Sequence, residues 1–184
     1  MNRVLYVSSV GSIMGLNKYR SRYSVLQKYI TKRNTINKPY NYNYNNAIVG
    51  IKMEPIIIKE FEEYANVKRY KATKVSGRYK NFMIRGICDG ITSNGKLLEV
   101  KSRINHIHEN ISLNDYAQMQ TYMELYNMNE CYYVQKLVGE DFIDVNVVTR
   151  NYDYWKYHIY PALVDFVNLI DYQENMQAQT TDDS

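Results

Sequence analysis

The residues best suited to catalysis in this chain of 184 residues lie between positions 85 and 103, in the sequence RGICDGITSNGKLLEVKSR. Asp89 follows one β-like run, and Glu99 and Lys101 lie in a second β-like run after the turn Ser-Asn-Gly. Because side chains alternate along a strand, Glu99 and Lys101 share one face. Two carboxylates at one site repel unless a cation lies between them, and oxygen ligands suit Mg²⁺ or Mn²⁺. A lysine beside such a cation can orient or deprotonate a water molecule, so the pattern predicts a metal-dependent hydrolytic site. A hairpin with an ordinary solvated face is the alternative.

Two further polar residues stand in segments with helical patterns. Glu54 lies in the expected helix 47–67, where an acid is favoured near a helix N-terminus. The other interpretation of Glu54 is a third metal-site carboxylate that the helix delivers to the hairpin. Gln118 interrupts the apolar surface of a second expected helix, residues 113–127. Local patterns alone favour the first interpretation of Glu54 and give Gln118 no role.

Charge is distributed unevenly along the chain, although the net formal charge is only +4. No Asp or Glu occurs before Glu54, whereas acids outnumber bases from residue 140 onward. A basic first half indicates a polyanionic partner such as DNA, and the alternative is that surface lysines only keep the chain soluble. Ser8 or Ser9 is a suitable N-cap for a short helix, whose free N–H groups could bind a phosphate.

Length and composition fit one domain with a substantial core. Cys88 and Cys131 lie in apolar, strand-like runs, which is typical of buried free thiols in a cytosolic protein. Two cysteines are too few to hold an iron–sulfur cluster. No apolar run approaches the length of a membrane span, so we expect no membrane contact. The expected location is the cytoplasm.

The expected elements follow the order helices, hairpin, helix, two strands and a last helix over residues 151–170. This order predicts an α/β protein with a single domain, residues 1–170, in which a central mixed β-sheet is flanked by helices. Residues 171–184 are polar and are expected to form a disordered C-terminal tail.

The spacing of Asp89, Glu99 and Lys101 resembles the PD-(D/E)xK nuclease superfamily, with Cys88 in place of the proline. Four segments resemble, in the same order over residues 4–150, the branch of phage lambda exonuclease and the YqaJ-like viral recombinases. They are VSSVGSIMGLNKYRS, GIKMEPIIIKEFEEY, CDG followed by LLEVK, and YAQMQTYMELY. Four motifs in order are far more specific than any one of them.

This resemblance implies a restriction-endonuclease-like core and gives roles to particular residues. The ligands it implies for Mg²⁺ or Mn²⁺ are Glu54, Asp89, Glu99 and the carbonyl of Val100. Lys101 is expected to act on the attacking water or the phosphate, and Gln118 to position one of them. The residues expected to contact nucleic acid are Ser8, Ser9, Arg20, Arg22, Arg78, Arg103 and Tyr122. Ile87 stands where the family has a serine, and Arg3 is the nearest candidate for its phosphate-pocket arginine.

The resembling family implies a metal-dependent exonuclease that hydrolyses double-stranded DNA from an end, 5′ to 3′, in recombination, repair or viral DNA processing. A structure-specific endonuclease of the same superfamily is one alternative, and a catalytically idle DNA-binding module is another. The implied partners are DNA, a single-strand annealing protein and further copies of the chain in a homo-oligomer.

Overall fold

The computed structural model describes residues 3–31 and 44–182. Its N-terminal half contains β1 (Arg3–Tyr6), the 3-10 turn η1 (Val7–Ser9), α1 (Val10–Ile13), α2 (Arg22–Ile30), α3 (Tyr44–Ala65), β2 (Arg69–Tyr70), β3 (Val75–Arg78) and β4 (Phe82–Gly86). Its C-terminal half contains β5 (Gly90–Thr92), β6 (Leu97–Arg103), α4 (Leu113–Tyr126), β7 (Glu130–Leu137), β8 (Asp144–Thr149), α5 (Tyr152–Tyr154), the π-helical turn η2 (Trp155–Ile159) and α6 (Tyr160–Asp182). No helix in these two ranges is long and apolar enough to span a membrane.

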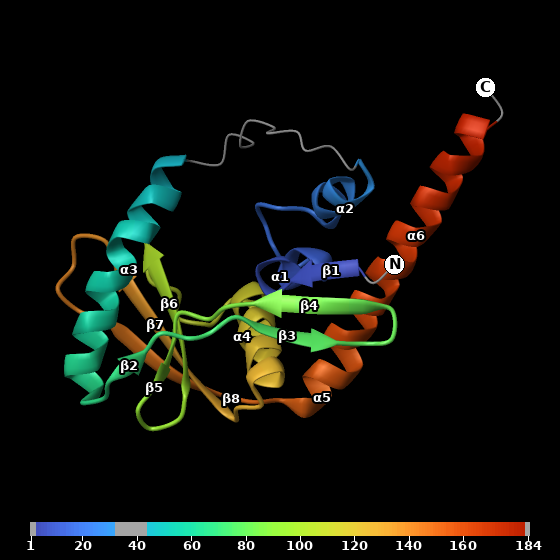
Figure 1. The fold of residues 1–184 in the computed structure, drawn as a ribbon. Helices are drawn as coiled ribbons and strands as arrows, with labels where there is room; N and C mark the ends of the chain where they lie inside the picture. The colour runs from blue at the N-terminus through green and yellow to red at the C-terminus, as the bar shows by residue number, and fades with distance from the viewer. Residues whose placement is uncertain (1–2, 32–43, 183–184) are drawn as a thin grey trace.

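The strands form two sheets (Figure 1). The larger has the order β2-β5-β6-β7-β8, with β6 parallel to β7 and the other neighbours antiparallel. The smaller has the order β1-β4-β3, with β1 parallel to β4 and β3 antiparallel to it. The structure therefore confirms the expected α/β fold with a mixed sheet flanked by helices. Helix α4 connects β6 to β7, as a crossover between parallel strands requires.

Two apolar clusters lie on opposite faces of the larger sheet. On one face, Leu98 and Val100 of β6 pack with Ile57 and Phe61 of α3. On the other face a larger cluster joins β6 and β7 to α1, α4 and α6. Cys88 and Cys131 are buried free thiols, as predicted. Because β6 contributes to both clusters, α3 and α4 fix its position from two sides.

Helix α3 begins earlier than its sequence pattern indicates. The expected helix 47–67 is observed as Tyr44–Ala65, and Pro55 lies inside it. Glu54 is therefore in the middle of the helix as well. The explanation of Glu54 as an acid favoured by the helix N-terminus is wrong for this reason.

Helix α6 runs to Asp182, through the residues expected to form a disordered tail. Pro161 is in the first turn, and the rest of the helix contains no Gly or Pro, so nothing in the sequence terminates it after the buried positions end. Arg3 of β1 forms ion pairs with Asp171 and Glu174 at this extension. Arg3 is thus engaged with α6, and it is not free to serve as the phosphate-pocket arginine.

Candidate active site

Strand β6 presents a polar face to α4. Its residues Glu99, Lys101 and Arg103 lie on the face opposite to Leu98 and Val100, which pack toward α3. In the register with the parallel strand β7, Glu99 stands beside Tyr133 and Lys101 beside Gln135. Glu99 is only 2% exposed. A buried carboxylate needs compensating partners, because burial disfavours its charged form. The polar face of β6 therefore carries ionisable side chains that are buried in the fold.

Lys101 and Gln118 both contact the same oxygen of Glu99. Lys101 Nζ lies 2.7 Å from Glu99 Oε1, and Gln118 Nε2 donates to Oε1 at 2.8 Å. Lys101 Nζ also approaches Gln118 Oε1 at 3.4 Å. Gln118 reaches Glu99 and Lys101 because α4 packs across this face of β6. The structure thus brings together Glu99, Lys101 and Gln118, which lie in two separate sequence motifs.

Asp89 joins this group from the connection between β4 and β5. Its Oδ2 accepts a hydrogen bond from the backbone N–H of Val100 at 2.7 Å. Its own carbonyl accepts two hydrogen bonds from the guanidinium of Arg69, one of them from Nε at 2.8 Å. A Cβ at Gly90 would lie 2.6 Å from Arg69 Cγ, so only glycine leaves room for this side chain. Arg69, which the sequence analysis did not single out, thus holds the backbone at Asp89.

The carboxylates of this group are held at unusually high pKa values. Burial raises the pKa of Glu99 to about 7, although the nearby Lys101 ammonium lowers it. Burial also raises the pKa of Asp89, against the hydrogen bond from Val100, and the charge of Glu54 raises it further. Burial lowers the pKa of Lys101, but Glu99 and Asp115 outweigh it and raise the value to about 12. The site therefore holds negative charge that its own cations only partly offset.

One observation indicates that the carboxylate oxygens of this group suit a divalent cation. Glu99 Oε2 is buried and has no hydrogen-bond partner in the described part of the chain. An unpaired buried carboxylate oxygen is costly unless a ligand satisfies it, and Mg²⁺ and Mn²⁺ prefer such oxygens. Across residues 3–31 and 44–182, however, no three His, Cys, Asp or Glu side chains surround one point closely enough to hold a metal ion. Glu54, half-buried in α3, is near enough to raise the pKa of Asp89.

The sequence analysis missed Asp115, which is buried beside Lys101 and Arg103. Its Oδ2 accepts hydrogen bonds from Arg103 at 2.9 Å and from the Tyr133 hydroxyl at 2.8 Å, and its Oδ1 lies 3.9 Å from Lys101 Nζ. Burial raises the pKa of Asp115, but Lys101 and these two hydrogen bonds outweigh it and hold the pKa below its usual value. Its spacing of three residues from Gln118, on one face of α4, was the available signal.

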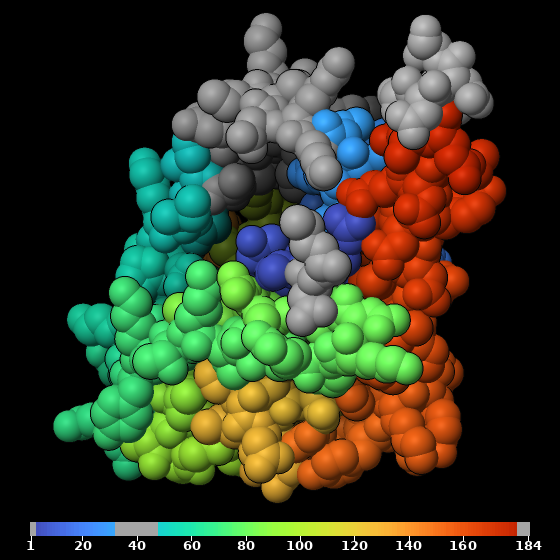
Figure 2. Space-filling view, turned by 45° about the vertical axis from the view of Figure 1, so that its right-hand side comes forward, coloured from blue at the N-terminus to red at the C-terminus, as the bar shows by residue number. Residues whose placement is uncertain are grey.

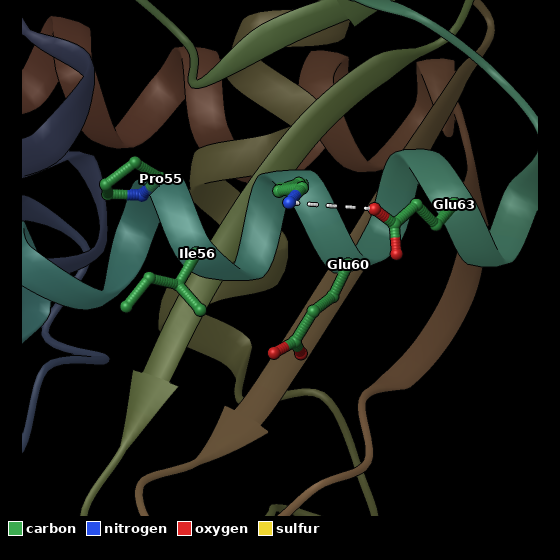
Figure 3. A pocket seen from close by; sticks show the side chains of 5 residues that line it. Pro55, Ile56, Glu60 and Glu63 are labelled. Atoms are coloured by element: carbon green, nitrogen blue, oxygen red, sulfur yellow. Dashed lines mark ion pairs between the residues drawn. The ribbon is translucent and has the colours of Figure 1, made fainter.

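The molecular surface is hollowed between α3 and the segment of β1 and α1, above β4, and yellow-green atoms of the segment around β6 are visible deep inside (Figure 2). A separate shallow pocket lies on α3 and is lined by Pro55, Ile56, Lys59, Glu60 and Glu63 (Figure 3). Its lining includes none of Asp89, Glu99, Lys101 and Gln118, so we do not assign this pocket to the candidate site.

Comparison with known proteins identifies the family. The sequence model of the YqaJ-like viral recombinase domain matches residues 4–135. The chain belongs to this family. No curated protein matches the sequence.

Solved structures share the fold of this YqaJ-like domain. The alkaline exonuclease LHK-Exo from Laribacter hongkongensis superposes with a TM-score of 0.76 at 16% identity, covering 98% of this chain and 94% of that chain. The structure of LHK-Exo in complex with dAMP gives a TM-score of 0.73 at 15% identity, with coverages of 96% and 94%. A phage related exonuclease from Haemophilus somnus 129PT gives 0.64 at 14% identity, with coverages of 98% and 97%. At these identities the likeness establishes a nuclease fold.

Two residues expected to contact nucleic acid are engaged within the YqaJ-like domain. Arg103 bonds to Asp115 and also donates to Gln135 at 2.9 Å. Tyr122 is 5% exposed, and its hydroxyl donates to the carbonyl of Ile87 at 2.7 Å. Both side chains are therefore hydrogen-bonded to other parts of the fold.

The other expected contacts lie nearer the surface. Ser8 is exposed whereas Ser9 is buried, so only Ser8 of these two rivals offers its side chain to a ligand. Arg78 is exposed on β3. Arg22 pairs with Asp165 of α6, and Arg20 is half-buried before α2. Ser8 and Arg78 are therefore the most accessible of the predicted contacts.

Proposed function

We propose that this protein is a metal-dependent deoxyribonuclease that hydrolyses double-stranded DNA from an end. The observation that carries the proposal is the row of Glu99, Lys101 and Gln118, with Asp89 on the adjacent connection, in a nuclease fold. Membership of the YqaJ-like family supports it, as does the likeness to solved alkaline and phage related exonucleases. A catalytically idle DNA-binding module is the alternative. These residues do not support it, since the chain retains all the residue types that the proposed reaction needs.

The residues that would hold one or two Mg²⁺ or Mn²⁺ ions are Glu54, Asp89, Glu99 and the carbonyl of Val100. Such ions would polarise the scissile phosphate and lower the pKa of a bound water. Lys101 would orient or deprotonate the attacking water, or neutralise charge on the phosphate. Gln118 is hydrogen-bonded to Glu99 and would position the water or the phosphate. Glu99 Oε2 supports this assignment because it is buried and has no hydrogen-bond partner among the residues that the structure describes.

The substrate would be held mainly through its backbone. Arg20, Arg22 and Arg78 would contact phosphates without reading bases, so binding would weaken strongly with salt. Ser8 would approach a 5′-terminal phosphate, consistent with degradation from 5′ to 3′. Acting on DNA in recombination, repair or viral DNA processing, the protein would work in the cytoplasm, or in the host cytoplasm or nucleus.

The test compares linear duplex DNA, labelled at either the 5′ or the 3′ end, with a closed circle, in Mg²⁺ and in chelator. Loss of the linear DNA only, in Mg²⁺ only, is the expected result, with the 5′ label released first. Cutting of the circle would favour the endonuclease alternative, and DNA binding without cleavage would favour the idle module. Light scattering and a pull-down with a single-strand annealing protein would test the two assembly partners.

A further inference from the structure

Asp115 is a buried acid whose environment the proposed reaction does not yet explain. It is 5% exposed, and it lies in the first turn of α4, where Ser112 caps its backbone N–H at 3.1 Å. Helix capping does not require the Asp115 side chain, since Ser112 supplies the cap. The side chain points instead to β6, where it meets Arg103 and Lys101.

The carboxylate of Asp115 is itself firmly held. Arg103 and Tyr133 both donate to Oδ2, and Asn114 Nδ2 approaches Oδ1 at 3.2 Å. Oδ1 is the oxygen that lies 3.9 Å from Lys101 Nζ. Arg103 and Tyr133 thus fix one oxygen of the carboxylate, which leaves the other directed at the lysine.

Lys101 therefore lies between two buried carboxylates from different elements. Glu99 of its own strand is 2.7 Å from Nζ on one side, and Asp115 of α4 is 3.9 Å from it on the other. Gln118, one turn after Asp115 on the same face of α4, approaches the same ammonium at 3.4 Å. A side chain as flexible as lysine needs such contacts to keep one rotamer.

We propose that Asp115 is a positioning residue that holds the Lys101 ammonium in its catalytic place. The inference rests on the nuclease activity proposed above and adds a residue to it. Asp115 forms ion pairs with Lys101 and Arg103 and is hydrogen-bonded to no expected metal ligand, so its main effect is expected on the chemical step. Displacement of a catalytic group by about 1 Å can lower the rate by about 10²-fold.

The test measures single-turnover cleavage of a linear duplex in Mg²⁺ by wild type and Asp115→Asn, which keeps the shape of the side chain and removes its charge. The expected result is a rate about 10²-fold lower, with unchanged DNA affinity and with a change in Mn²⁺ affinity that is far smaller than the change in rate. Asp144→Asn is the matched control. Asp144 Oδ2 accepts from Gln135 at 3.0 Å in the same network but has no contact with Lys101, so this variant should cleave at the wild-type rate.

A second variant separates positioning from stability, since Asp115→Asn leaves the buried Arg103 charge unpaired. Arg103→Met with Asp115→Asn removes both charges, and replacing a buried ion pair with neutral residues often restores stability. The double variant should melt near the wild-type temperature and still cleave slowly. A wild-type rate in it, or a further loss when Asp115→Asn is added to Lys101→Ala, would overturn the inference. Inactive wild type would instead refute the nuclease proposal itself.

Discussion

The two faces of β6 differ in what they bury. Toward α3, Leu98 and Val100 pack into an apolar cluster with Ile57 and Phe61, and every contact favours the folded state. Toward α4, the same strand buries the carboxyl group of Glu99, whose pKa is raised and whose Oε2 has no hydrogen-bond partner in the described part of the chain. The apolar face toward α3 stabilises the folded state, whereas the burial of Glu99 on the face toward α4 destabilises it.

This difference indicates how the fold tolerates a reactive site. A protein that breaks the rules of burial at one place must offset the cost at another, and such places are expected to be functional. Here the stabilising contacts are those of Leu98 and Val100 with α3, on the opposite face of the same strand. Substitutions on the two faces should therefore have separable effects, one set on chemistry and the other on stability.

The largest effect is expected from the polar face. Lys101→Ala should lower the cleavage rate by roughly 10²- to 10⁴-fold, because it removes the group that is proposed to act on the water or phosphate. Asp89→Ala and Glu99→Ala should be similarly inactive through loss of the metal. Circular dichroism and DNA affinity should stay close to wild type. Cleavage at the wild-type rate by any of the three would refute the assignment of that residue.

Leu98→Ala, on the apolar face next to Glu99, should do the reverse. Leu98 is fully buried, so truncation should cost about 2 to 5 kcal/mol of unfolding free energy. Urea denaturation measures this loss, and cleavage assayed well below the melting temperature should remain close to wild type. A stable Leu98→Ala protein with a large loss of activity would mean that the two faces are not independent.

Removal of metal should make stability depend on pH through Glu99. Its pKa is about 7 in the folded chain against an ordinary 4.5, so the folded state binds the proton more tightly. Stability is therefore lost as the pH rises from 4.5 to 7 and stays lost above, by about 3 kcal/mol in total.

Thermal melts in chelator measure this effect against Glu99→Gln, which cannot ionise. The variant should gain stability relative to wild type between pH 5 and pH 8, and added Mg²⁺ should raise the melting temperature of wild type only. A difference between the two proteins that does not change with pH would contradict the raised pKa.

The smallest effect is expected far from β6. Arg3→Ala removes the pairs with Asp171 and Glu174, but Asp171 is half exposed, so the loss should be about 1 kcal/mol or less. Hydrogen exchange should show faster opening of residues 171–182 in α6, and cleavage should be unchanged. A large loss of activity would return Arg3 to the substrate site.

The sequence was sufficient for the parts of the site that local patterns encode. Alternation along β6 placed Glu99 and Lys101 on one face, and the resemblance added Gln118, which the structure places at the same carboxylate. The contributions of Arg69 and Asp115 could not be predicted in this way. Arg69 meets Asp89 only because β2 pairs with β5, and Asp115 looked like an ordinary acid in a first helical turn.

Long-range contacts also explain the other differences. Arg3 and Asp171 are 168 residues apart, so no local pattern predicts that β1 will anchor the extension of α6. Arg103 and Tyr122 resemble DNA contacts by residue type and motif, yet both bond inside the protein. Charge and motif indicate which partners a residue suits, but the packing of other elements decides which partner it meets.

The most direct test of the central claim is calorimetric titration of Mn²⁺ into wild type and Glu99→Gln at pH 8. We expect one or two ions bound per wild-type chain and a marked loss of affinity in the variant, because Glu99 supplies a buried oxygen that has no hydrogen-bond partner in residues 3–31 and 44–182. Equal affinity in the two proteins would contradict the account, since the polar face of β6 would then not be the metal site.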